Sequence, residues 1–156
     1  MEIIVADHAG FCFGVNRAMD LALEAGEEKE EQVHTLGPLI HNPQAVQKLK
    51  DLGVEVEEEV DNLLEGTVII RSHGVPPETL ETLDKQNLNV INATCPFVKR
   101  AQEKARELQE KGYQVLISGD KNHPEVIAIL GHTDNQAIVV EDESDFDKIP
   151  KKKKVG

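Results

Sequence analysis

The chain has 156 residues, of which 39% are hydrophobic and 29% charged, which is ordinary for one globular domain or two small ones. Its net charge of -12 disfavours polyanionic partners, so we expect no binding to nucleic acid or to an anionic membrane surface. No apolar run reaches the ~20 residues that span a bilayer, and the N-terminus lacks the basic region of a signal peptide, so we expect a cytoplasmic protein.

Apolar runs alternate with segments of helical periodicity along most of the chain. In chain order, the first half of the pattern predicts a strand over 3–6, a helix over 15–25, a charged loop over 27–31, a strand over 33–36, a helix over 43–52 and a strand over 54–56. The middle part predicts a strand over 67–70, a helix over 77–85, a strand over 88–91 and a helix from 96 to near 112. The last part predicts a strand over 114–117, a helix over 124–130, a strand over 137–140 and a short acidic helix from 144. Prolines mark four of the predicted helix starts, and Asn42 is a candidate N-cap.

This alternation predicts an α/β protein with parallel sheets. Recurrence of the pattern predicts two similar small α/β units, one over residues 1–95 and one over residues 96–156. After the lysines at 151–154, a new apolar run begins and stops at Val155 and Gly156. We therefore expect the second unit to be incomplete and the chain to be part of a longer protein.

Reactive side chains follow most of the predicted strands, close to the start of the next helix. In open α/β sheets this edge is where ligands bind. Because independent structural residues would not share this placement, we interpret the set as one site: Cys12, His41, His73, Cys95, His123 and Glu125.

Cys12 and Cys95 are the only cysteines, and in a reducing compartment they are better read as ligands or free thiols than as a disulfide. Each precedes a helix, whose N-terminus favours the thiolate that binds metal. Gly10 and Gly14 would let the backbone approach a ligand closely. The alternative is that both are small buried apolar residues. Two thiols alone do not complete a common metal site.

The three histidines at this edge suit a phosphate or diphosphate, because imidazolium groups and helix N-termini both attract anions. Each could instead be a helix cap or a surface residue, and Glu125 could be either a proton donor or a first-turn acid that complements the helix dipole. Dinucleotide, Walker and Cys-x-x-Cys motifs are absent. Two alternatives remain open: an anion-binding α/β module without redox activity, and a mononuclear zinc protein.

Five motifs together resemble a known family. They are Gly10-Phe11-Cys12-Phe13-Gly14-Val15, Gly37-Pro38-Leu39-Ile40-His41-Asn42, Ser72-His73-Gly74-Val75, Asn92-Ala93-Thr94-Cys95-Pro96 and His123-Pro124-Glu125-Val126. Their identity and order resemble the 4-hydroxy-3-methylbut-2-enyl diphosphate reductases, the IspH/LytB family of isoprenoid precursor biosynthesis by the methylerythritol phosphate pathway.

The resemblance implies three α/β units around a 4Fe-4S cluster, with one cysteine from each unit. Cys12 and Cys95 would be two of the cluster's ligands, and the three histidines would hold the diphosphate of the allylic substrate. Glu125 would be the acid in the reductive dehydroxylation to isopentenyl and dimethylallyl diphosphate. The electron donor would be a protein such as ferredoxin or flavodoxin.

The chain departs from the family pattern in one respect. The third unit, with the third cysteine and a threonine that pairs with the glutamate, is absent from these residues. We therefore expect these 156 residues to be inactive or weakly active alone.

Overall fold

The computed structural model describes residues 1–28, 31–151 and 154–156. The predicted loop over 27–31 and the lysine run over 151–154 therefore lie partly outside the described residues. The helices are α1 (Phe13–Glu28), α2 (Pro43–Asp51), α3 (Pro77–Asp84), α4 (Pro96–Glu110) and α5 (Pro124–Gly131), with 3-10 turns η1 (Val60–Asn62) and η2 (Glu143–Lys148). The strands are β1 (Val33–Leu36), β2 (Val54–Glu57), β3 (Thr67–Ile70), β4 (Asn89–Asn92), β5 (Leu116–Ser118) and β6 (Ile138–Val140).

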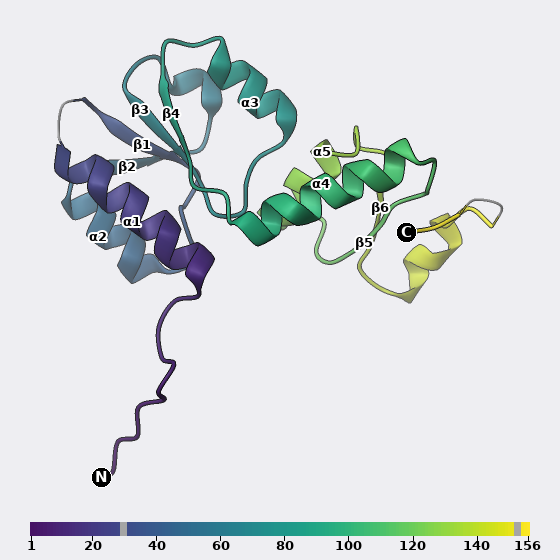
Figure 1. Ribbon diagram of the computed structural model, residues 1–156, viewed down its shortest axis with the longest axis horizontal. Coiled ribbons are helices and arrows are strands. Elements are labelled where there is room, and N and C mark those ends of the chain that lie inside the picture. Colours follow the sequence, from purple (N-terminus) through teal and green to yellow (C-terminus); the bar gives the residue numbers. More distant parts are fainter. Residues whose placement is uncertain (29–30, 152–153) are drawn as a thin grey trace.

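The first sheet has four parallel strands in the order β2-β1-β3-β4. Helices α1 and α2 cover one face of this sheet, and α3 covers the other (Figure 1). All four residues of β3 are buried, as expected for a central strand that is covered on both faces. The predicted α/β class with parallel strands is confirmed.

Two hydrophobic cores lie on opposite faces of this sheet. Along β3, Ile69 packs with α1 and α2, whereas Val68 and Ile70 pack with α3 and η1. Successive side chains of a strand point to opposite faces, so one apolar strand supplies both cores. Each fully buried Val, Leu or Ile contributes about 1.5–3 kcal/mol to the free energy of unfolding. This packing on both faces holds β3 in place, and with it the strand end that leads to the site.

A second, two-stranded parallel sheet pairs β5 with β6. Its smaller core is formed with α4 and α5 by Ala105, Val115, Ile117 and Val126. On the other side of β5, Gln114 forms a parallel bridge with Val155, and the Leu116 amide donates to the Gly156 carbonyl at 2.9 Å. The apolar run that begins at Val155 therefore pairs as a strand would.

Helix starts follow the prolines closely. Helices α2, α4 and α5 begin at Pro43, Pro96 and Pro124, and α3 begins at Pro77. Proline suits the first helical position because its missing N–H has no partner there in any case. The Asn42 side chain accepts a hydrogen bond from the Ala45 amide at 2.9 Å, which confirms it as the N-cap of α2.

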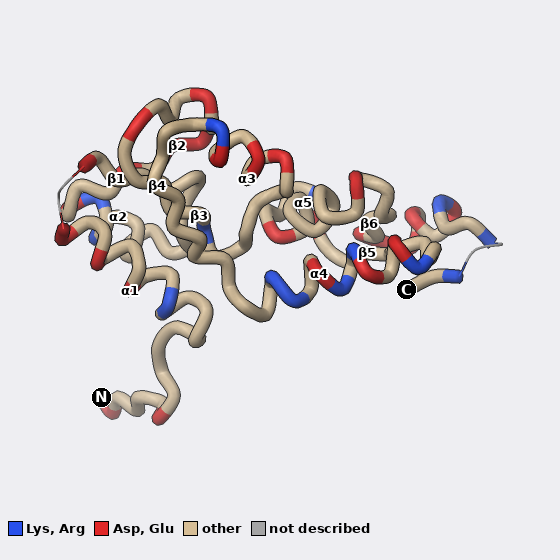
Figure 2. The backbone as a smooth tube through the Cα atoms, turned by 45° about the horizontal axis from the view of Figure 1, so that its top comes forward, with Lys and Arg blue, Asp and Glu red and all other residues tan. Residues whose placement is uncertain are grey.

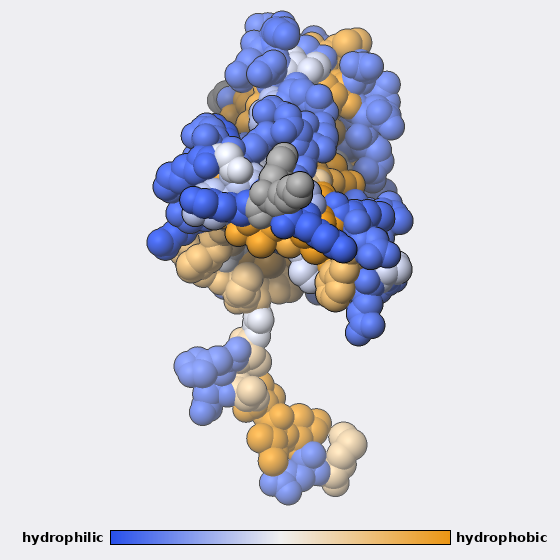
Figure 3. All heavy atoms as spheres, turned by 90° about the vertical axis from the view of Figure 1, so that its right-hand side faces the viewer, coloured by the Kyte–Doolittle hydropathy of each residue, from blue (hydrophilic) through white to orange (hydrophobic). Residues whose placement is uncertain are grey.

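The predicted strand over 3–6 is wrong. Residues 3–6 form no strand, and Ile3, Ile4 and Val5 are 74%, 84% and 74% exposed. This N-terminal arm extends away from the rest of the molecule (Figures 1 and 3). Apolar β-branched residues favour a strand, but a strand also needs a neighbour for its backbone hydrogen bonds, and no described strand pairs with this segment.

None of the described helices is both long enough and apolar enough to cross a membrane.

Candidate functional site

The first sheet reverses its strand order between β1 and β3. Chain connections leave the carboxyl ends of these two strands in opposite directions, which opens a crevice where ligands bind in α/β proteins. His41 lies in the loop after β1, and His73 lies in the loop after β3. The fold therefore places both side chains at the expected binding edge.

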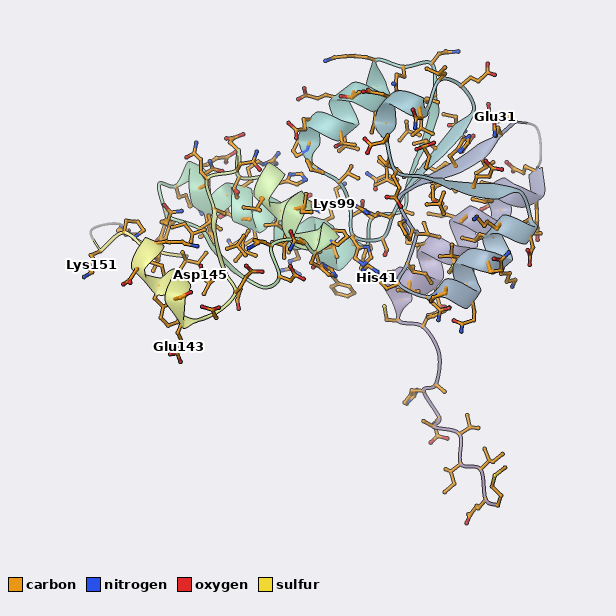
Figure 4. All side chains as sticks on the ribbon, turned by 180° about the vertical axis from the view of Figure 1, so that it is seen from behind. Glu31, His41, Lys99, Glu143, Asp145 and Lys151 are labelled. Atoms are coloured by element: carbon orange, nitrogen blue, oxygen red, sulfur yellow. The ribbon has the colours of Figure 1, made fainter. Side chains whose placement is uncertain are left out.

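His123 joins these two residues from the second sheet's region, at the N-cap of α5. The ring centroids of His41 and His73 are 4.5 Å apart, and each lies 5.4 Å from the His123 ring. One nitrogen from each ring lies within 4.8 Å of the others. His41 lies where the two parts of the molecule meet (Figure 4). Three loops far apart in sequence thus form one cluster, which we call the histidine triad.

His73 is held neutral at pH 7 by its surroundings. Burial is the largest cause that lowers the pKa of His73 from 6.5 to about 4, and positive charge on His41, His123 and Arg71 acts in the same direction. Its Nδ1 atom is buried and has no hydrogen-bond partner among the described residues. A buried polar atom without a partner is costly, so this nitrogen is available to a ligand.

Glu125 is positioned by its neighbour His123. The Glu125 amide donates to His123 Nδ1 at 3.2 Å, so Nδ1 is the acceptor and the other ring nitrogen, Nε2, is free to donate. Glu125 is half-buried in the first turn of α5. The triad and the acid at this edge are therefore linked through the same helix start.

Cys95 lies in a loop with several anchors. It occupies the N-cap of α4 and is half-buried, and its amide donates to the Ser72 carbonyl at 2.9 Å. One residue earlier, the Thr94 amide donates to the Asn92 side chain at 3.0 Å. The bond to Ser72 ties the Cys95 loop to the loop that carries His73, and the bond to Asn92 stabilises the Cys95 loop itself.

Cys12 is exposed and precedes α1, with its carbonyl accepting from the Asn16 amide at 2.9 Å. It does not follow a strand, because the predicted strand over 3–6 is not formed. Gly14, two residues later, lies against Cys95: a Cβ on Gly14 would be 2.4 Å from Cys95 Sγ. The helix that follows one cysteine therefore packs directly on the other.

This arrangement fits part of a metal–sulfur site. Two thiols come from neighbouring helix starts, and the missing side chain of Gly14 lets α1 pack against the Cys95 thiol, but an iron–sulfur cluster needs further thiolates and the chain has only two cysteines. The histidine triad offers a different chemistry. Its nitrogens can donate to an anion or, when neutral, could hold a cation.

Sequence reasoning missed two residues that position this site. Arg17 of α1 donates to the carbonyls of Thr94 and Asn92 at 3.4 and 3.3 Å. Gln102 of α4 is 4% exposed and donates to the His73 carbonyl at 3.4 Å. Gln102 had a signal in the sequence, because with Val98 and Ala105 it occupies an inward-facing helical position where an apolar residue is the rule.

Comparison with known proteins identifies the family. The family model described as LytB protein matches residues 3–156. The 4-hydroxy-3-methylbut-2-enyl diphosphate reductase of Geobacter metallireducens is 48% identical over 156 residues, which cover 100% of this chain and 55% of that protein. The enzyme of the same name from Aquifex aeolicus is 51% identical over 160 residues, with the same two coverages.

Solved structures agree with this result. A structure of (E)-4-hydroxy-3-methyl-but-2-enyl diphosphate reductase matches with a TM-score of 0.82 and 51% identity, covering 94% of this chain and 53% of that one. The corresponding reductase from Plasmodium falciparum matches with a TM-score of 0.89 and 28% identity, covering 96% and 48%. The chain thus spans about half the length of the relatives it matches, and it belongs to the LytB protein family.

Proposed function

We propose that this chain is the N-terminal portion of a 4-hydroxy-3-methylbut-2-enyl diphosphate reductase. The reaction would consume the allylic alcohol, two electrons and two protons, and would release water and the dehydroxylated allylic or homoallylic diphosphate. The observation that carries the proposal is the convergence of three imidazoles from three loops, beside the two loops that bear the cysteines. Family membership supports the same reaction class.

In this proposal the histidine triad holds the diphosphate. The free Nε2 of His123 and the unpartnered Nδ1 of His73 supply donors. The amides at the starts of α2 and α5 add partial positive charge. These local donors offset the long-range repulsion by a chain of net charge -12.

Glu125 is the proposed proton donor. It lies two residues from His123, and its amide is fixed by the His123 ring, so an anion held by the triad would lie near this carboxyl group. A carboxylic acid there can protonate the departing hydroxyl so that it leaves as water.

Cys12 and Cys95 would be two ligands of a 4Fe-4S cluster, with the third cysteine supplied from outside these residues. When bound, the cluster would supply the two electrons and a Lewis-acid iron for the hydroxyl group. The electrons would come from a carrier such as ferredoxin or flavodoxin in the cytoplasm. We further propose that residues 1–95 and 96–156 are two α/β units that meet at Cys95, because separate sheets lie on either side of this boundary.

Metal analysis separates this proposal from the alternatives. The whole reductase that contains this sequence, purified without oxygen, should contain iron and acid-labile sulfide. Zinc without sulfide would favour a mononuclear zinc site, and neither metal would favour an anion-binding module. For the 156 residues alone, we expect at most a trace of turnover; full turnover with a stable cluster would contradict the assigned ligand set.

The anion site is tested by His41→Ala in this chain. We expect the dissociation constant for inorganic diphosphate, measured by calorimetry, to rise about 10- to 150-fold, because losing a hydrogen bond to a charged group costs roughly 1.5–3 kcal/mol. His8→Ala is the matched control, because His8 is exposed on the N-terminal arm. Unchanged diphosphate affinity in His41→Ala would remove this residue from the site.

Glu125→Gln tests the proton donor in the whole reductase. The amide keeps the shape but cannot donate the proton, so kcat should fall about 10²–10⁴-fold, as for loss of a general acid, with little change in diphosphate affinity. Wild-type kcat in this variant would show that the assignment is wrong.

A further inference from the structure

A cavity of about 260 Å³ lies where the two sheets' regions meet. Its walls come from α3, from α4, from the end of β4 and from the C-cap of α5. Pockets at such boundaries often bind small ligands, and they usually measure ~300–1,000 Å³. This cavity, which we call the α4 cavity, therefore has room for a ligand smaller than most.

One side of α4 forms the charged wall of the cavity. The residues are Lys99, Gln102, Glu103 and Arg106, and their spacing places them on one face of the helix. Two cations therefore face the cavity with a single acid. The whole chain has 29 acidic and 17 basic residues, so a wall with an excess of positive charge is unusual here. Figure 2 shows the basic residues gathered on α4.

The two cations of this wall are largely unpaired. Lys99 takes part in none of the ion pairs found in the described ranges, and neither does Glu103. Arg106 lies 3.8 Å from Glu110, with both side chains more than half exposed, and such a pair contributes little. Both positive charges are therefore available to a bound anion.

His132, the C-cap of α5, adds a polar group without a partner. The residue is half-buried, and its Nδ1 atom is buried with no hydrogen-bond partner among the described residues. Burial is the largest cause that lowers the pKa of His132; positive charge on Arg106 acts in the same direction, and negative charge on Glu103 opposes it. Arg106 and Glu103 thus lie within electrostatic reach of this ring. A buried polar atom without a partner often marks the place of a water or an ion.

The remaining wall combines hydrogen-bonding and apolar groups. Asn92 and Thr94 lie at the carboxyl end of β4, and Val75 and Leu80 are apolar. Neutral donors beside two cations suit a phosphate group, because its oxygens accept several charge-assisted hydrogen bonds. The apolar pair suits a short hydrocarbon group attached to that phosphate.

Gln102 separates the α4 cavity from the histidine triad. It is 4% exposed, lines the cavity, and donates to the His73 carbonyl at 3.4 Å. None of the three triad histidines is among the described residues that line the cavity. The cavity is therefore distinct from the site described above.

We propose that the α4 cavity binds a small phosphate monoester. Lys99 and Arg106 hold the phosphate, and Val75 and Leu80 contact the organic group. The proposal requires neither a cluster nor reductase activity, so it can fail or succeed separately from the proposed function.

The test is an NMR titration of the ¹⁵N-labelled chain with phenyl phosphate, which joins one phosphate to a small apolar ring. Amide signals of Thr94, Glu103 and His132 report on the cavity, whereas those of His41 and His123 report on the triad. We expect saturable shifts in the cavity signals. Inorganic phosphate should bind the cavity at least about fivefold more weakly, because it makes no apolar contact.

The double variant Lys99→Gln/Arg106→Gln removes the two cations. The dissociation constant for phenyl phosphate, taken from the cavity signals, should rise at least about tenfold, because both charge-assisted contacts are lost. The matched control is Arg100→Gln/Lys104→Gln, which removes the same charge from the same helix at residues that line a different hollow. This control should bind within about threefold of the wild type.

Three results would overturn the proposal. They are equal losses of affinity in the two double variants, equal binding of phenyl phosphate and inorganic phosphate, and shifts confined to the triad signals. Unchanged amide signals away from the substituted positions would show that both variants keep the fold. In the whole reductase, calorimetry with phenyl phosphate should distinguish the two double variants in the same way, and equal affinities there would also contradict the proposal.

Discussion

The two cysteines occupy similar positions but are held very differently. Each precedes a helix and provides the carbonyl for its first hydrogen bond. Cys95 is half-buried, and its loop is anchored to Ser72, Asn92 and Arg17. Cys12 is exposed and adjoins an arm that pairs with none of the described strands.

This difference shows that the first sheet preorganises one side of the site, whereas the other side depends on how α1 packs. The side chain of Arg17 and the missing side chain of Gly14 are what join the two sides. Arg17 and Gly14 lie outside the histidine triad, but substitutions at these residues should still disturb the contact between the two cysteine loops.

Gly14→Val should have the largest effect on stability. Even a Cβ at this position would lie 2.4 Å from Cys95 Sγ, so α1 and the Cys95 loop must separate. We expect unfolding free energy, from urea titration, to fall by about 2–3 kcal/mol, as for overpacking. Ala101→Val, at an exposed helical position, should cost less than about 1 kcal/mol. Equal losses in the two variants would mean that the contact between the cysteine loops does not matter.

The binding of inorganic diphosphate should depend on pH through His73. In the free chain, burial is the largest cause that holds the pKa of His73 at about 4, and a bound anion stabilises the imidazolium and raises this pKa. Affinity should therefore increase as pH falls from 7, by up to about tenfold per pH unit for one linked proton, and level off below about 4.

Diphosphate itself also titrates, so the pH dependence of its dissociation constant should be compared between wild type and His73→Gln. Calorimetric titrations at several pH values give both curves, and their difference is the contribution of His73. If the two affinities show the same pH dependence, His73 takes up no proton on binding.

Without ligand, the same residue lowers stability in acid. The unfolded chain binds a proton at His73 near the ordinary pKa of 6.5, whereas the folded chain binds it only near about 4. The unfolding free energy should therefore fall as pH decreases from about 6.5 to about 4. Other groups also titrate in this range, so the unfolding free energy of the wild type and of His73→Gln should be measured by urea unfolding at several pH values. The contribution of His73 is the part of the decrease in unfolding free energy that is missing from the variant.

Arg17→Ala should have a smaller effect on stability. The two hydrogen bonds to the Asn92 and Thr94 carbonyls are 3.3 and 3.4 Å long and partly exposed, so their loss should cost about 1 kcal/mol. Arg100→Ala is the control, because Arg100 is exposed in α4. Indistinguishable urea midpoints for the two variants would show that Arg17 does not anchor the Cys95 loop.

The smallest effects should come from the thiols themselves. In the chain without metal, Cys12→Ser should change the unfolding free energy by less than about 0.5 kcal/mol, as at other exposed sites. Cys95→Ser should cost up to about 1 kcal/mol, because Cys95 packs against Gly14. A greater loss from Cys12→Ser than from Cys95→Ser would reverse the comparison between the two loops.

Much of this fold could be predicted because local signals coincide with tertiary structure. Strands β1 and β3 have the predicted bounds, and Pro43, Pro96 and Pro124 mark three helix starts. The strand over 3–6 was predicted wrongly because apolar residues show a preference for pairing but not whether a partner strand is present. The roles of Cys12, Cys95 and Glu125, and the binding of substrate by the histidine triad, stay predictions.

Placement of the histidines was predictable because parallel strands bring their carboxyl ends to one edge. The contribution of α5 to the same cluster was expected only from recurrence of the motif. Arg17 could not be predicted, because its acceptors are backbone carbonyls more than 70 residues away, and carbonyls have no sequence signal. Gln102 could have been inferred as buried, but not its bond to the His73 loop.

Strand β5 lies between β6 on one side and residues 154–156 on the other. An interior strand exchanges its amide hydrogens more slowly than an edge strand, because opening it requires two ladders to break. The loop that ends at His123 begins on this strand. Residues 154–156 therefore cover the second edge of β5, so the loop that carries His123 leaves from an interior strand that should exchange slowly rather than from a frayed edge.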